Sequence, residues 1–342
     1  MTEKPEYNIS VDVLKSCAAF AVVVLHCAAE VMDDSCTTSI NWWIANFFNA
    51  SVRWSVPIFV MISGALLLDS RGDENCIRFF SKRVRRLLVP VLFWTCFYYF
   101  FRYSHGGLTV KQAIGGMLRG TPFYHLWYLY MIPGLYLFTP ALRVYVAHSS
   151  SRERMFLIIL IFTISIFQDI ISTFIYSGQP TLFTMFIRYI GYYLCGYQLS
   201  KDDFHLIKKT YSGFIIFACA LLSALGTGVL VHFFNLSSHN GGFYFYSNFN
   251  PVIILMSLCI YHFLTDVRLT GADKIRHYAP LTLGIYALHP FVLNRLGRWD
   301  FFLTHFTGTY FVIPVKAILT FFICGVVVKG LIRLPYVRQI VI

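Results

Sequence analysis

Long apolar runs dominate this chain and restrict what it can fold into. A helix needs about 20 mainly apolar residues to cross the roughly 30 Å hydrocarbon core of a bilayer. Ten stretches near that length follow one another, and charged residues make up 13% of the sequence, against about 25% in soluble domains. The predicted spans are residues 9–31, 43–68, 84–102, 125–146, 155–175, 181–199, 210–233, 250–265, 279–296 and 303–331. We therefore expect an all-α polytopic membrane protein of about ten transmembrane helices, and one membrane domain over residues 1–342.

The basic residues between these spans predict the orientation of the chain. Lysine and arginine concentrate in the cytoplasmic connections of membrane proteins. With the N-terminus in the cytoplasm, nineteen of the 28 basic residues fall in inner connections and five in outer ones. This distribution predicts that both termini are cytoplasmic. The formal net charge of +12 is dispersed among the spans, so we expect membrane lipids around the protein and no nucleic acid partner. The nine cysteines include no CxxC pair, and we expect no metal.

The first span carries the most unusual residues. Asp12, Lys15 and His26 lie on one helical face of an apolar segment, and Glu30 follows His26 by one turn. A charged side chain at the centre of a membrane helix costs about 2.5–3.5 kcal/mol on insertion scales, so such residues are functional candidates. In the functional interpretation His26 is a base that Glu30 polarises. In the structural one, Asp12 and Lys15 neutralise each other and a neighbouring helix satisfies His26.

The second span combines one charge with residues that shape a helix. Arg53 lies at its outer end, where a charge requires a partner or an anionic substrate. Pro57 predicts a kink in the helix. Gly64, which follows Ser63, predicts the close approach of a neighbouring helix.

A basic cluster opens the third span. Four of the five residues from Lys82 to Arg86 are basic, and Arg83 and Arg86 share one helical face. The cytoplasmic bias of basic residues accounts for part of this cluster. Arginine also binds phosphate through a two-pronged fork, so the pair is a candidate anion site at the inner boundary.

Polar and aromatic residues in three later spans are further candidates. His125 and Trp127 begin the fourth span on the outer side, as an aromatic belt or as a platform for a sugar. Arg188 lies in the sixth span and His289 in the ninth. Both require a partner if they are buried in the membrane.

Two outer connections have a composition of their own. The Gly-rich connection after the third span contains an amphipathic stretch, Val110–Leu118, which we expect to be re-entrant or interfacial. Asn235–Asn250 is rich in Asn, Ser, Gly and Tyr and has no lysine or arginine. It is an ordinary exposed loop or a surface suited to sugar hydroxyls.

Taken in order, several short elements resemble the acyltransferase-3 family of integral membrane acyltransferases, especially the stand-alone members that O-acetylate bacterial surface glycans. The elements are Asp12-Val-Leu-Lys15 followed by His26, Ser63-Gly64, Lys82-Arg83-Val-Arg85-Arg86-Leu-Leu-Val-Pro90, His125-Leu-Trp127 and Tyr286-Ala-Leu-His289-Pro290. The resemblance covers nearly the whole chain. It implies a multi-pass protein of the bacterial inner membrane, an acyl-CoA donor from the cytoplasm, and a glycan or lipid-linked sugar acceptor at the outer face.

The resemblance also implies roles for particular residues. His26 matches the essential histidine of the family, and Arg83 and Arg86 match its paired arginines near the donor. The family usually has an arginine where this chain has Lys15. An ammonium contacts a phosphate without forming the two-pronged bond of a guanidinium.

These observations together predict an O-acyltransferase, most specifically an O-acetyltransferase that uses acetyl-CoA as donor. His26 would act as general base, and a relay through an acyl-enzyme is the variant of this mechanism. The predicted catalytic residues are His26, Glu30 and Asp12. The predicted donor-binding residues are Lys15, Arg83, Arg86 and Ser63. The predicted residues for acceptor binding or oxyanion stabilisation are Arg53, His125, Trp127, Arg188 and His289.

Two other classes of protein fit part of the pattern. Intramembrane charges also mark ion-coupled transporters, here of a small polar or acyl-bearing solute, although the sequence has no repeated pair of broken helices. A membrane scaffold or sensor would leave His26 and the arginines dispensable. Neither the acceptor glycan nor the oligomeric state follows from the sequence.

Overall fold

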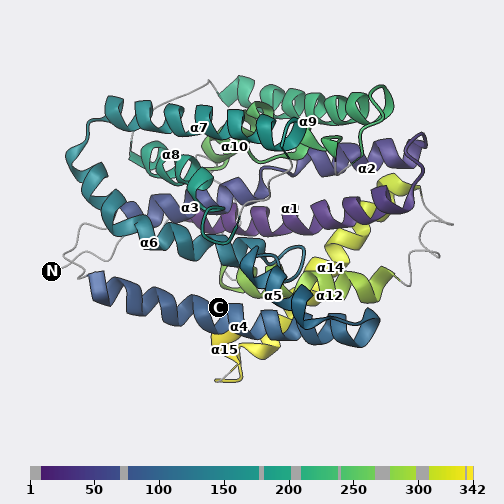
Figure 1. Ribbon diagram of the computed structural model, residues 1–342, viewed down its shortest axis with the longest axis horizontal. Helices are drawn as coiled ribbons and strands as arrows, with labels where there is room; N and C mark the ends of the chain where they lie inside the picture. Colours follow the sequence, from purple (N-terminus) through teal and green to yellow (C-terminus); the bar gives the residue numbers. More distant parts are fainter. Residues whose placement is uncertain are drawn as a thin grey trace.

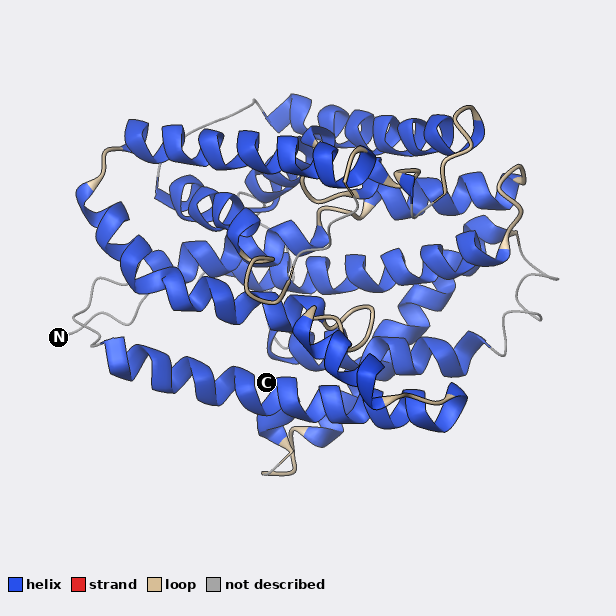
Figure 2. Ribbon diagram, viewed as in Figure 1, coloured by secondary structure: helices blue, strands red, loops and turns tan. Residues whose placement is uncertain are grey.

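The computed structural model of the protein describes residues 9–69, 76–176, 181–201, 209–237, 240–265, 278–297, 308–335 and 337–341. Within these ranges the chain consists of helices joined by loops and turns (Figure 2). The longer helices run roughly along one direction and form a bundle (Figure 1). The predicted all-α fold is confirmed.

The helices follow the apolar runs of the sequence. The α-helices are α1 (Ile9–Asp34), α2 (Ile40–Ser51), α3 (Ser55–Leu68), α4 (Cys76–Gly106), α5 (Val110–Leu118), α6 (Trp127–His148), α7 (Ser151–Phe174), α8 (Ile190–Lys201), α9 (Lys209–His232), α10 (Pro251–Thr265), α12 (Thr282–Leu296), α14 (Thr309–Leu331) and α15 (Arg338–Val341). Single 3-10 turns, η1 (Ile187–Tyr189), η3 (Tyr244–Tyr246) and η4 (Ala279–Leu281), come shortly before α8, α10 and α12.

Eight helical segments among the described residues are long and apolar enough to cross a membrane. The polytopic prediction is therefore confirmed, but the count differs from the ten predicted spans. Residues 181–199 and 279–296 fold as the shorter helices α8, with 12 residues, and α12, with 15. At 1.5 Å per residue these helices measure about 18 and 22 Å, less than the hydrocarbon thickness.

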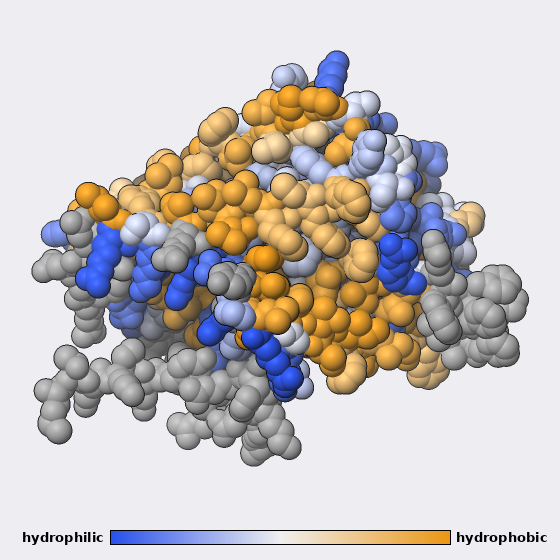
Figure 3. Space-filling view, turned by 90° about the horizontal axis from the view of Figure 1, so that it is seen from below, coloured by the Kyte–Doolittle hydropathy of each residue, from blue (hydrophilic) through white to orange (hydrophobic). Residues whose placement is uncertain are grey.

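The surface of the bundle is apolar where a bilayer would surround it. Large apolar side chains are exposed along α7, α9 and α14, including Phe167, Phe214 and Phe322. In Figure 3 a broad hydrophobic zone crosses the middle of the molecule, with hydrophilic residues at both ends. Such a zone is stable against lipid and not against water.

Helix α1 lies inside the bundle (Figure 1) and packs against α2, α3, α10, α12 and α14. Its apolar residues Leu14, Ala18 and Val23 are fully buried. The polar residues of the first span are therefore held among other helices, away from lipid.

The predicted second span is broken in two, which corrects the expectation of a simple kink. Residues 52–54 form a turn between α2 and α3, and Pro57 lies in the first turn of α3. Because proline has no N–H, the carbonyl of Arg53 cannot receive the helical bond from position 57. The break places Arg53 at the junction of the two helices. Irregular backbone at membrane depth is tolerated where protein buries it or where it lines a cavity.

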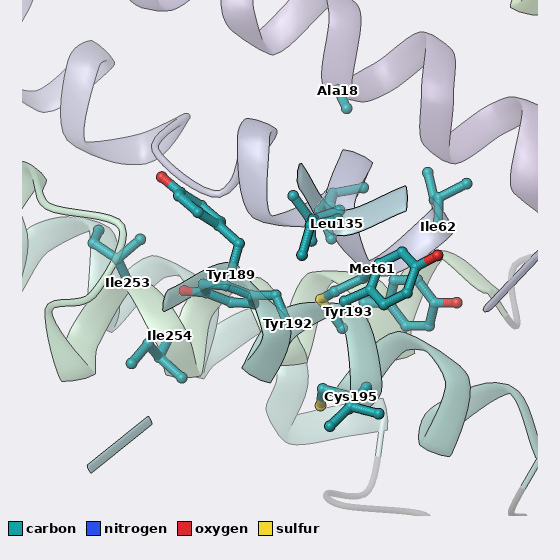
Figure 4. Packing of buried hydrophobic residues seen from close by; sticks show 14 of the residues in the cluster. Ala18, Met61, Ile62, Leu135, Tyr189, Tyr192, Tyr193, Cys195, Ile253 and Ile254 are labelled. Atoms are coloured by element: carbon teal, nitrogen blue, oxygen red, sulfur yellow. The ribbon is translucent and has the colours of Figure 1, made fainter. Parts of the chain in front are cut away.

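The contact between α3 and α8 confirms the prediction for Gly64. A Cβ added to Gly64 would lie 1.8 Å from the carbonyl oxygen of Tyr193 on α8, and one added to Gly196 would lie 2.0 Å from that of Met61 on α3. The two glycines therefore let the backbones of α3 and α8 touch. Around this crossing Met61, Tyr193 and their neighbours belong to a large cluster of buried apolar residues (Figure 4).

The amphipathic stretch in the outer connection forms α5 with the predicted bounds. Thr109 caps the helix: its side chain accepts a bond from the N–H of Gln112, whose side chain accepts one from the N–H of Thr109. Val110, Ile114 and Leu118, one turn apart, are exposed. The helix is confirmed, and its interfacial position stays a prediction.

Candidate functional site

Three histidines from distant parts of the sequence meet beside α1. The ring centres of His26 on α1 and His289 on α12 are 5.1 Å apart and nearly stacked, and those of His289 and His125 are 5.4 Å apart. His125 lies in the turn that leads into α6. The ring of Tyr124 is 5.0 Å from that of His26. We call His26, His125 and His289 the histidine cluster.

Pro290 fixes how His289 is hydrogen bonded. The proline has no N–H to bond the carbonyl of Tyr286 four residues earlier, and the Nδ1 of His289 lies 2.6 Å from this oxygen. A carbonyl only accepts, so Nδ1 carries the proton. In the neutral ring Nε2 is then a bare acceptor, and it is buried with no hydrogen-bond partner among the described residues.

His125 is held in the same way by other backbone groups. Its Nε2 lies 3.3 Å from the carbonyl oxygen of Ala287, which also accepts a 2.7 Å bond from the hydroxyl of Tyr98. Tyr286 donates its hydroxyl to the carbonyl of His125. Nε2 therefore carries the proton, and the bare Nδ1 is buried without a partner in the described chain.

These tautomers limit the chemistry of the cluster. The unpartnered nitrogens of neutral His125 and His289 can accept a proton or a hydrogen bond, and they cannot donate one. They suit a ligand that brings a hydroxyl group. They do not suit the stabilisation of an oxyanion, which requires donors. His26 is half-buried and has a ring neighbour on each side.

Glu30 lies one turn beyond His26 and forms an ion pair that the sequence did not predict. Its Oε2 accepts a 2.7 Å bond from the Nζ of Lys316 on α14, whose side chain is 2% exposed. The pair joins α14 to α1 next to the histidine cluster. The predicted action of Glu30 on His26 stays a prediction.

We expect Glu30 and Lys316 to be strongly coupled. Directly contacting charged groups show interaction energies of about 0.5–3 kcal/mol in double-mutant cycles, and burial of Lys316 weakens screening by water. Thermal unfolding in detergent of Glu30→Gln, Lys316→Met and the double variant should give a coupling energy above about 1 kcal/mol. Additive effects would show that the pair does not stabilise the bundle.

At the other end of α1, Lys15 and Asp12 form the expected pair. Their charged atoms are 3.9 Å apart, and Asp12 is the more buried of the two. Lys15 also lines a narrow cavity of about 160 Å³, which we call the lysine cavity. Its described lining is Lys15, Phe59, Ile62, Ser63, Tyr128, Thr282, Leu283 and Tyr286. Since Tyr286 also contacts His125, this cavity ends beside the histidine cluster.

The arginines of α4 lie near the same cavity. Arg83 is half-buried, with its guanidinium 4.9 Å from the ring centre of Phe79, and Arg86 is exposed. Arg143 of α6 lies over the same ring at 4.6 Å. The electrostatic environment of the Tyr136 hydroxyl includes Arg83, Arg86 and Ser63. The predicted donor-binding residues therefore form one neighbourhood.

The predicted acceptor residues divide between the histidine cluster and a second cavity. Arg53, Trp127 and Arg188 line a cavity of about 330 Å³, which we call the arginine cavity. Its described lining is Arg53, Arg119, Thr121, Trp127, Asp169, Met185, Arg188, Tyr189, Tyr246, Ser247, Asn248 and Phe249. This volume is at the lower end of the range of about 300–1,000 Å³ for small-molecule sites.

Arg188 has the partner that its burial requires. Its Nη2 donates a 2.6 Å bond to Asp169 of α7 and a 3.0 Å bond to the carbonyl of Ser165. Its guanidinium lies 3.8 Å from the ring centre of Phe249. Asp169 was missed from the sequence, although it is an acid inside an apolar run and that signal could have identified it.

Arg53 connects the arginine cavity to the histidine cluster. Its Nε donates a 2.7 Å bond to the side chain of Asn49, which donates a 3.2 Å bond to the carbonyl of Leu25, the neighbour of His26. The guanidinium lies 4.0 Å above the ring of Tyr246. The break between α2 and α3 thus places Arg53 in the lining of the arginine cavity, beside the turn of α1 that carries His26.

The polar loop predicted as an exposed segment or a sugar surface contributes to this cavity. Its described residues Tyr246, Ser247, Asn248 and Phe249 are part of the lining. The side-chain amide of Asn248 donates a 2.8 Å bond to the hydroxyl of Tyr189, which fixes the loop against η1. The residues that sequence reasoning missed are Asp169, Lys316, Arg119, Tyr246 and Asn248.

Comparison with known protein families shows the family to which this chain belongs. A family model described as an acyltransferase domain, acyltransferase-3, matches residues 8–329, nearly the whole chain. The chain belongs to the acyltransferase-3 family. A search of curated proteins gave no match, and a search of solved structures gave none. In this acyltransferase the histidine cluster adjoins residues that line both cavities, Tyr286 and Trp127. Within the described residues, no group of three or more His, Cys, Asp and Glu side chains is arranged to hold a metal ion.

Proposed function

We propose that this acyltransferase transfers an acyl group, most specifically acetyl, from acyl-CoA to a hydroxyl of a cell-surface or lipid-linked glycan, as a multi-pass protein of the bacterial inner membrane. The observation that carries the proposal is that both cavities adjoin the histidine cluster. The lysine cavity reaches Tyr286, whose ring contacts His125, and the arginine cavity is lined by Trp127, which follows His125 by two residues. A substrate in each cavity would therefore lie next to the histidine cluster.

The lysine cavity is suited to the donor. Lys15, Arg83 and Arg86 supply positive charge at the end of the bundle that the charge distribution places in the cytoplasm, and arginine binds phosphate with a two-pronged fork. Lys15 and His26 are eleven residues apart, about 16 Å along the helix. The flexible arm of CoA would follow this path and bring the thioester past Ser63 to His26.

The reaction at the cluster needs one base. The acceptor hydroxyl oxygen attacks the thioester carbonyl carbon while His26 takes the hydroxyl proton. The carbon–sulfur bond then breaks, and the proton passes from His26 to the CoA sulfur. The products are the acyl ester and CoA thiol. His125 and His289, which present bare nitrogens, accept hydrogen bonds from neighbouring hydroxyls of the acceptor and orient it.

Donor binding tests the proposal directly. Purified protein should bind radiolabelled acetyl-CoA, and free CoA should compete. Arg83→Gln should weaken binding about tenfold or more, because a hydrogen bond to a charged group contributes about 1.5–3 kcal/mol. Arg295→Gln is the matched control, since this arginine lies against Phe291 and Phe101, away from both cavities. Absence of competed binding in the unaltered protein would favour a transporter or a scaffold.

Mass spectrometry of surface glycans from cells with and without the gene would identify the acceptor.

A further inference from the structure

The arginine cavity has an excess of positive charge that its own residues do not balance. The lining contains Arg53, Arg119 and Arg188 and a single acid, Asp169. Asp169 is paired with Arg188. Arg119 is exposed at the cavity, and water screens its charge. The uncompensated positive charge of the arginine cavity therefore comes mainly from Arg53.

Arg53 is held in place by groups that leave its charge uncompensated. Its Nε bonds a neutral amide, Asn49, and its face lies on the ring of Tyr246. No described carboxylate pairs with it, and its two terminal nitrogens have no hydrogen-bond partner in the described residues. A partly buried cation without a counter-ion is costly. An anionic ligand in the cavity would remove that cost and receive the two terminal donors as a fork.

The rest of the lining is suited to a sugar. The rings of Trp127 and Tyr189 lie 5.9 Å apart and offer an apolar face. The Oδ2 of Asp169 and the Nε of Arg188 are buried and have no described partner, so this ion pair in the cavity lining has one acceptor and one donor left to satisfy. Sugar hydroxyls satisfy both kinds of group.

We propose that the arginine cavity selects an acidic acceptor, a sugar that carries a carboxylate or a phosphate, with Arg53 binding the anionic group and Asp169 and Arg188 binding hydroxyls. This inference deepens the proposed function and rests on it, because the bound sugar is an acceptor only if the protein transfers an acyl group to it. Hydrogen bonds through Asn49 fix Arg53 relative to the backbone beside His26. A sugar whose anionic group binds Arg53 would therefore be held at a set distance from His26.

Ligand binding without the donor tests the inference. Saturation-transfer NMR titrations of the purified protein with glucuronate, glucose 1-phosphate and glucose give three dissociation constants, and acetyl-CoA is left out. We expect at least one of the two anions to bind about tenfold or more tightly than glucose. The tighter anion shows whether the acidic group is a carboxylate or a phosphate. Arg53→Gln should remove this preference while glucose binding stays within about twofold, and Arg53→Lys should keep part of it. Arg295→Gln should behave as the unaltered protein.

Equal binding of the three ligands, or an anion preference unchanged in Arg53→Gln, would overturn the inference. If Arg53 instead stabilised the reacting carbonyl, the substitution would slow transfer and leave the three dissociation constants unchanged. Bound glucose in each variant shows that the cavity is folded. Anion binding without any acetyl transfer from acetyl-CoA would overturn the proposed function and leave the assignment of the cavity intact. Acetyl transfer without a preference for the anions would overturn the assignment of the cavity and leave the proposed function intact.

Discussion

Replacement of His26 by alanine should lower acetyl transfer by about 100-fold or more while acetyl-CoA binding stays within about twofold. General base catalysis contributes about 10²–10⁴-fold, and His26 is the member of the histidine cluster that lies on α1. The proposed donor site consists of Lys15 and the arginines of α4, which the substitution does not change. The measurement pairs a transfer assay with radiolabelled acetyl-CoA and an equilibrium binding assay on the same preparation.

A matched histidine controls for nonspecific effects. His105 lies at the exposed end of α4, where its Nδ1 contacts the carbonyl of Phe101, and His105→Ala should keep full activity. Equal amounts of both variants in the membrane and equal unfolding temperatures would exclude misfolding. Transfer by His26→Ala within a few-fold of the unaltered protein would rule out His26 as the base.

Addition of one methyl group at Gly64 or Gly196 should destabilise the bundle severely. The new Cβ would lie 1.8 or 2.0 Å from a backbone carbonyl oxygen of the facing helix, and a backbone cannot move aside as a side chain can. Overpacking in a well-packed core costs about 1–3 kcal/mol, and we expect the upper end for Gly64→Ala and Gly196→Ala. Thermal unfolding in detergent measures the loss.

Gly325 is the control for this pair. It lies within α14, and a Cβ at this position would meet nothing within 4 Å. Because alanine is the better helix former by up to about 1 kcal/mol, Gly325→Ala should be neutral or stabilising. If all three substitutions had the same effect, helix propensity rather than the contact of α3 and α8 would determine stability.

Much of this fold follows from local sequence. Apolar run length predicted the helices, and the amphipathic stretch Val110–Leu118 has the bounds of α5, because both are properties of neighbouring residues. The break between α2 and α3 was predicted only as a kink. Pro57 removes one helical bond, but whether the chain bends or unwinds there depends on which tertiary contacts satisfy the freed groups. The lengths of α8 and α12 likewise depend on the 3-10 turns before them.

The candidate site was predicted as separate residues and not as an arrangement. His125 and His289 are more than 150 residues apart in the chain, and no spacing rule brings them to His26. Lys316 and Asp169 could have been identified as charges inside apolar runs, yet their partners Glu30 and Arg188 lie on other helices. Such pairs depend on how the helices are packed together, which a single sequence does not display.

The two cavities differ in the kind of backbone that builds them, and this difference has an evolutionary consequence. Every described residue that lines the lysine cavity belongs to an α-helix of the packed bundle. In the arginine cavity only Trp127 and Asp169 do, while the others come from loops, 3-10 turns and the junction before α3. Loops accept substitution and insertion far more readily than packed helices. If the two cavities have the proposed roles, a lineage descended from this protein is therefore free to change its acceptor sugar while its thioester donor stays the same.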